Sequence, residues 1–129
     1  MNITKVVTLV LIAVHGFLVI WATVGLIEWF WEAPPWPRVS NALFPRDILF
    51  MQWTLTLTAG IVFIAGSVLE WSYLHIAMAC VYAAMASLCA VETFGYMESD
   101  SRFVAMLAEY AAYATILVFL FRSRPFHPG

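Results

Sequence analysis

Charge is scarce in this sequence. Only 11% of the 129 residues are Asp, Glu, Lys or Arg, and 64% are hydrophobic; a typical soluble domain has about 25% charged and about 45–50% apolar residues. A soluble chain of this length could not hide so much apolar surface, so lipid is expected to surround most of it. The six basic residues form no stripe and the net charge is −2, which excludes the usual signature of nucleic-acid binding.

Motifs of catalysis and redox chemistry are missing as well. The sequence has no nucleophile elbow, HExxH motif, P-loop or glycine-rich dinucleotide turn, so we do not expect an enzyme. Cys80 and Cys89 belong to no CxxC pair. Nine positions on a helix separate them by about 13 Å, too far for a disulfide. They are interpreted as small buried residues.

What the sequence does contain is four long apolar runs, at residues 6–31, 48–69, 73–96 and 102–121. Each has the roughly 20 residues that a helix needs to cross a bilayer. The first run exceeds the apolar part of a signal peptide, about 7–15 residues, and is expected to be a retained span. The predicted fold is therefore all-α: a single domain, residues 1–129, that forms a four-transmembrane-helix antiparallel bundle and is an integral membrane protein.

The connectors between these runs differ in character. Residues 32–47 hold four of the six prolines and cannot continue a helix. Asp47 is expected to cap the helix that follows. Residues 70–72 form so short a join that the second and third spans must pack as an antiparallel hairpin. Aromatic residues at the long connector suit the membrane surface and are candidates for docking a partner: Trp29, Trp31, Trp36 and Phe44.

Each run carries one oxygen-bearing side chain near the same end of the bundle. Glu28, Gln52, Glu92 and Glu109 lie about 5, 7, 5 and 10 Å from that end at about 1.5 Å per residue. A carboxylate at this depth is costly unless it is paired or neutral, which favours an inward orientation. Carboxylates that converge in a dry bundle would have to share a proton or bind a cation. These four residues are the candidate ion or proton site.

For Glu109 the favoured interpretation is a structural hydrogen bond within the bundle, and the alternatives are a contact with another subunit and an ion, proton or metal site. A paired-metal centre is weakly supported because bundles that hold one usually use Glu-x-x-His, which does not occur here. The identity of any metal stays unknown from the sequence.

His15 is the candidate cofactor ligand. It lies inside the first run, next to Gly16, which leaves room for the macrocycle of a haem or chlorophyll-type pigment. His75 differs from it in depth by about 10 Å, which disfavours one haem held by both. A histidine hydrogen-bonded to a neighbouring helix is favoured over this cofactor role, and no cofactor is firmly implied.

The expected function is that of an accessory or scaffolding subunit of a larger membrane complex, respiratory or photosynthetic. Almost no sequence lies outside the runs, and small residues form rows suited to helix contacts. The lipid bilayer and other membrane subunits are then the partners. The alternatives are a small oligomeric proton- or cation-coupled transporter or channel that uses the buried carboxylates, and a haem- or pigment-binding protein through His15.

The expected location is the bacterial inner (cytoplasmic) membrane. Four spans return the chain to its starting side, and most acidic residues belong to the other side, so both termini are placed in the cytoplasm. In span count and loop placement the sequence resembles small four-span bacterial membrane proteins, the DoxX-like group among them. That resemblance rests on no motif and implies no residue roles.

Overall fold

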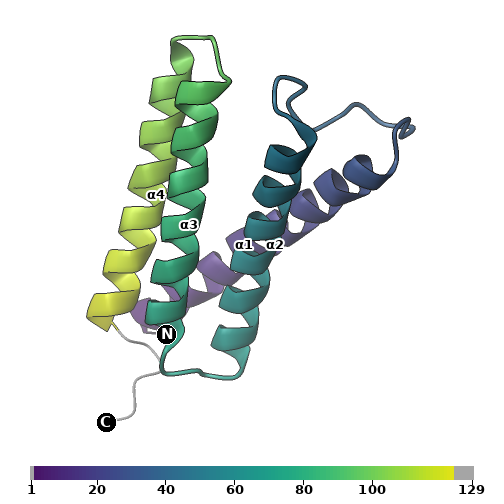
Figure 1. Cartoon of the computed structure of the whole chain (residues 1–129). Coiled ribbons are helices and arrows are strands. Elements are labelled where there is room, and N and C mark those ends of the chain that lie inside the picture. Colours follow the sequence, from purple (N-terminus) through teal and green to yellow (C-terminus); the bar gives the residue numbers. More distant parts are fainter. Residues whose placement is uncertain (1, 124–129) are drawn as a thin grey trace.

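The computed structural model describes residues 2–123, which form four α-helices (Figure 1). Their bounds are α1 Ile3–Phe30, α2 Arg46–Val68, α3 Leu74–Gly95 and α4 Ser101–Ser123. All four are long and apolar enough to cross a membrane. The helices begin and end within three residues of the expected spans, because prolines and polar residues interrupt the apolar runs where helices must stop.

Local hydrogen bonds explain the helix ends. Asn2 caps α1, since its side-chain oxygen accepts from the backbone N–H of Thr4 at 2.7 Å. The expectation that Asp47 caps α2 is wrong: Pro45 holds the cap position without a side-chain bond, and Asp47 lies in the first turn. Its carboxylate accepts from the N–H of Ile48 at 3.0 Å, where it still complements the helix dipole.

A left-handed residue ends α2. Glu70 has a φ of 53°, and the N–H of Trp71 returns to the carbonyl of Gly66 at 2.8 Å. This is the Schellman arrangement, in which glycine usually occupies the left-handed position. The turn closes α2 within a few residues and lets α3 start at Leu74, so the two helices run antiparallel as the short join predicted.

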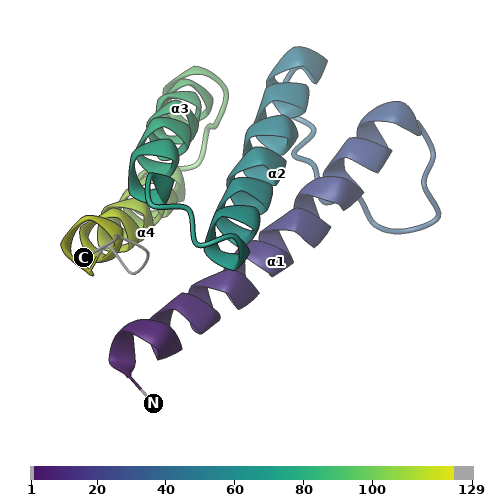
Figure 2. The same ribbon diagram turned by 90° about the horizontal axis from the view of Figure 1, so that it is seen from below.

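Every extensive helix contact within residues 2–123 joins sequence neighbours: α1 with α2, α2 with α3, and α3 with α4. Figures 1 and 2 show α3 and α4 side by side, whereas α1 crosses the other helices at a steep angle. Close approach at the α1–α2 crossing depends on glycine. A Cβ on Gly60 would lie 2.9 Å from the backbone oxygen of His15, and one on Gly25 would overlap the indole of Trp53.

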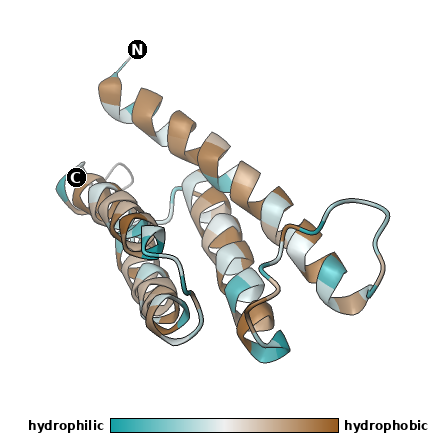
Figure 3. Ribbon diagram, turned by 90° about the horizontal axis from the view of Figure 1, so that it is seen from above, coloured by the Kyte–Doolittle hydropathy of each residue, from teal (hydrophilic) through white to brown (hydrophobic). Residues whose placement is uncertain are grey.

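The buried core lies where α2, α3 and α4 meet, around Phe63, Met78, Tyr82 and Leu120. Beyond this core the helices expose large apolar side chains, and Val104 on α4 is 70% exposed. Figure 3 shows hydrophobic residues along most of α1. Exposed apolar surfaces of this extent are typical of contacts with a membrane or with other proteins.

Candidate functional site

His15 lies at the centre of the molecule and is fully buried. Its Nδ1 is 2.7 Å from the carbonyl oxygen of Leu11, and its Nε2 is 2.5 Å from the hydroxyl of Tyr82 on α3. A carbonyl can only accept, so Nδ1 carries the proton and donates it to Leu11. Nε2 of the neutral ring then accepts from the Tyr82 hydroxyl. The histidine is thus bonded to a neighbouring helix, and a metal could reach Nε2 only by displacing Tyr82.

A row of four aromatic rings extends through this pair, with one ring from each helix. Phe63 of α2 stacks on His15 with ring centroids 4.1 Å apart and planes 9° from parallel. On the other side, Tyr82 stacks on Tyr113 of α4 at 4.7 Å and 14°. We call these four residues the ring row. Stacked aromatic pairs add about 0.5–1.5 kcal/mol beyond burial, so the ring row ties all four helices together.

Two of the predicted carboxylates lie close together between α3 and α4. Glu109 of α4 lies near enough to Glu92 and Cys89 on α3 to interact electrostatically with them. It also lies beside Tyr113, which belongs to the ring row. A hydrogen bond joins α3 and α4 nearby: the Tyr110 hydroxyl donates to the carbonyl of Ala86 at 2.8 Å. The chain therefore places a carboxylate pair next to a stacked tyrosine that leads to a buried histidine.

Glu28 binds the long connector, residues 31–45, rather than the other carboxylates. Its carboxylate is 2% exposed and accepts from the indole N–H of Trp36 at 3.0 Å. It also accepts from the backbone N–H groups of Val39, at 2.9 Å, and Ser40, at 3.2 Å. These charge-assisted bonds fold the connector back onto the end of α1. Glu28 is fully occupied by this role and lies apart from the Glu92–Glu109 pair.

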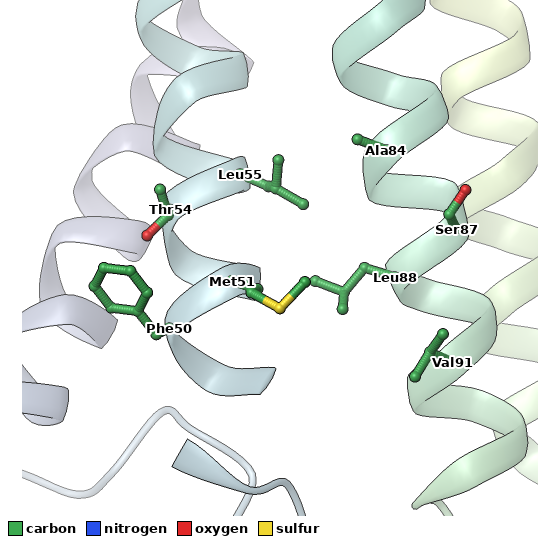
Figure 4. A pocket seen from close by; sticks show the side chains of 8 residues that line it. All are labelled: Phe50, Met51, Thr54, Leu55, Ala84, Ser87, Leu88 and Val91. Carbon is green, nitrogen blue, oxygen red and sulfur yellow. The ribbon is translucent and has the colours of Figure 1, made fainter. Parts of the chain in front are cut away.

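The side chain of Gln52 forms no hydrogen bond with Glu28, Glu92 or Glu109. Its Oε1 is buried and has no hydrogen-bond partner within the described part of the chain. An apolar groove of about 530 Å³, which Gln52 does not line, lies between α2 and α3. Met51 and Leu88 point toward each other across this groove (Figure 4). Of the four predicted polar residues, Glu92 and Glu109 are the two that lie near enough to each other to interact electrostatically.

The predicted docking aromatics divide into two groups. Trp29 donates to the backbone oxygen of Arg46 at 2.8 Å, and Trp36 donates to Glu28, so both are used within the chain. Phe44 packs near Tyr96 at 6.2 Å between centroids. Trp31 stays 47% exposed beside Phe30, which is 75% exposed.

Sequence reasoning missed Tyr82 and Phe63. Tyr82 had one usable signal: a hydroxyl in the middle of an apolar run needs a partner, and His15 is the buried group that can accept from it. Phe63 had none, because one phenylalanine among many apolar residues looks like any other core residue.

No three His, Cys, Asp or Glu side chains among residues 2–123 come close enough together to hold a metal ion. What the arrangement offers chemically is a hydrogen-bonded tyrosine–histidine pair and two carboxylates that interact electrostatically. No protein family, curated protein or solved structure matches this chain. The outline resemblance to the DoxX-like group therefore gains no support from these comparisons.

Proposed function

We propose that this chain is a four-span integral membrane protein, an open antiparallel bundle with both termini in the cytoplasm, that acts as an accessory subunit of a larger membrane complex. The location that we propose is the bacterial inner membrane. Energy-transducing complexes, respiratory or photosynthetic, are the hosts that suit a chain lying almost entirely within the bilayer.

The observation that most directly supports the accessory-subunit proposal is the open arrangement of the helices. Only Leu120 of the 23 residues of α4 is buried, and the extensive contacts join successive helices without closing the first onto the last. A self-contained bundle buries a stripe on every helix. The connector adds a fixed apolar surface, because Glu28 holds it in one shape while Phe30, Trp31 and Leu43 stay exposed. Such surfaces suit subunit contacts.

The test is purification of the tagged protein from native membranes in a mild detergent. We expect it to elute with a larger complex, and we expect Phe30→Ala together with Trp31→Ala to release it. Phe17→Ala is the matched control, because Phe17 is also an exposed aromatic on α1 but lies away from the connector. Elution of the unaltered protein as a monomer contradicts the proposal.

A second function, proton or cation movement, is favoured by the Glu92–Glu109 pair. Two neighbouring carboxylates in a low-dielectric setting hold a proton or a cation between them. Beside them, Tyr113 stacks on Tyr82, whose hydroxyl is bonded to His15.

Proteoliposomes containing a pH-sensitive dye test this second function. We expect proton flux from the unaltered protein, its loss in Glu109→Gln, and its retention in Glu98→Gln, which alters an exposed carboxylate of the α3–α4 connector. Absence of flux in the unaltered protein, or equal flux in Glu109→Gln, removes this function and leaves the accessory role standing.

A further inference from the structure

A small cleft lies where α1 ends and α2 begins. It has a volume of about 120 Å³ and is lined by Glu28, Trp29, Arg38, Ser40, Arg46 and Leu49. That is several times the roughly 10–15 Å³ that a cavity needs, by the same measure, to hold one water molecule, and it leaves room for a tetrahedral phosphate group. Because the cleft sits at the end of two candidate spans, it lies at the level of lipid headgroups if the helices cross a bilayer.

Both arginines of the cleft are held in place by backbone carbonyls. Nη2 of Arg46 donates to the oxygen of Trp29 at 3.0 Å, and Nη2 of Arg38 donates to the oxygen of Glu32. The Arg46 guanidinium also lies 4.4 Å from the centre of the Trp29 ring. Each guanidinium has several N–H donors, and one such bond leaves the others for a ligand. Fixed guanidinium groups favour phosphate, which they can bind with two parallel bonds.

The charge of the cleft suits a phosphodiester. Glu28 contributes one negative charge and the arginines contribute two positive ones, which leaves one net positive charge. The Glu28 carboxylate is already bonded to the connector by Trp36, Val39 and Ser40. Its repulsion of a bound anion is reduced by those donors. A phospholipid headgroup supplies one negative charge at its phosphate and matches this balance.

The cleft and the apolar groove between α2 and α3 adjoin at one lining residue of each. Trp29 contacts Phe50 with ring centroids 5.0 Å apart, and Phe50 lines the groove. Along α2, Phe50 lies about 6 Å and Thr54 about 12 Å from Arg46. The headgroup layer of a bilayer is about 5–8 Å thick on each side, so a phosphate at Arg46 would place the top of an acyl chain beside Phe50.

We propose that this cleft binds the phosphate of a membrane phospholipid whose acyl chain enters the groove between α2 and α3. The site depends on the chain being embedded in a bilayer but does not depend on a host complex or on proton movement. Phospholipid is favoured over free phosphate because the charged cleft and the apolar groove adjoin.

The experiment uses the delipidated protein in detergent, with thermal unfolding followed by tryptophan fluorescence. Phosphatidylglycerol, diacylglycerol and inorganic phosphate are titrated separately. We expect phosphatidylglycerol to raise the melting temperature at concentrations where the other two, each of which supplies half of the ligand, do not. Stabilisation by diacylglycerol or by inorganic phosphate equal to that by phosphatidylglycerol overturns the proposal.

Variants locate the effect. Arg38→Gln combined with Arg46→Gln is expected to weaken the response to phosphatidylglycerol about tenfold, through loss of charged hydrogen bonds. Arg102→Gln is the matched control, since Arg102 also bonds a backbone carbonyl and lies over an aromatic ring, but lies outside the cleft. Arg38→Gln alone carries the test if circular dichroism shows that the double variant has lost helix. An unchanged response in the folded variant overturns the proposal.

Discussion

The hydroxyl of Tyr82 lies 2.5 Å from Nε2 of His15, although 67 positions separate the two residues in the chain. The bond joins α1 to α3, which are not neighbours in sequence, and both side chains are almost completely buried. The tautomer is fixed by Leu11, so the bond has a single direction, from tyrosine to histidine. It is the polar centre of the ring row.

Removing the Tyr82 hydroxyl should therefore destabilise the fold. Tyr82→Phe leaves Nε2 of His15 buried without a partner, which costs about 1–3 kcal/mol in the free energy of unfolding. Denaturant titration of the detergent-solubilised protein measures this. Tyr73→Phe is the control, because Tyr73 is 61% exposed. Combining Tyr82→Phe with His15→Leu should cost less than the sum of the single changes, and strict additivity would show that the bond contributes nothing.

Alanine substitutions at two glycines of α1 should change the stability of the protein in opposite directions. Gly25→Ala forces a Cβ into the indole of Trp53, which is buried, and should cost about 1–3 kcal/mol through overpacking. Gly16→Ala meets no atom within 4 Å and should stabilise the helix by up to about 1 kcal/mol, since alanine is the better helix former. Melting temperatures of the two variants in one detergent compare them directly. Equal shifts would mean that α1 and α2 do not cross at Gly25.

Glu28→Gln should release the long connector. Glutamine keeps one acceptor oxygen but turns an N–H₂ group toward donors that the carboxylate accepts from now. We expect cleavage within residues 31–45 by a broad-specificity protease to become at least several-fold faster, because the lost charged hydrogen bonds are worth about 1.5–3 kcal/mol each. Glu32→Gln is the control, since Glu32 is exposed and contributes its backbone oxygen to Arg38. Equal protection in both variants would contradict the role given to Glu28.

Truncation of Leu120 tests how much the packing of α4 against the core contributes to stability. It is 2% exposed and is the one buried residue of α4, where it packs in the cluster with Phe63 and Met78. Leu120→Ala should lower the free energy of unfolding by about 2–5 kcal/mol. Val118→Ala, at a side chain that is 55% exposed, should change it little. Matching losses in the two variants would place α4 differently against the core.

The four helices could be predicted because their apolar runs are long and the interruptions between them are strong. Pro34 and Pro35 stop a helix by their covalent geometry, whatever the tertiary structure. The cap of α2 was misassigned because Pro45 and Asp47 both suit a helix start, and the choice between them depends on the path of the connector. That path is fixed by contacts with Glu28, which lies outside the local sequence.

The site was harder to predict for a rotational reason. Depth along a helix follows from counting residues, so Glu92 and Glu109 could be assigned to the same end of the bundle, and in the structure they lie near enough to interact electrostatically. Which way a side chain points around the helix depends on crossing angles, and sequence says little about those. Glu28 has a similar depth but points to the connector, and the pairing of His15 with Tyr82 needed the steep crossing of α1.

If α2 and α3 cross a bilayer, the left-handed turn at Glu70 also couples the insertion of the two helices. Because the chain reverses within a few residues, α2 cannot settle across a bilayer while α3 waits in water at a distance. An insertion machinery would have to release the two as one helical hairpin during biosynthesis. Lengthening this turn with a flexible segment would let the helices enter one at a time, without altering any side chain of the ring row.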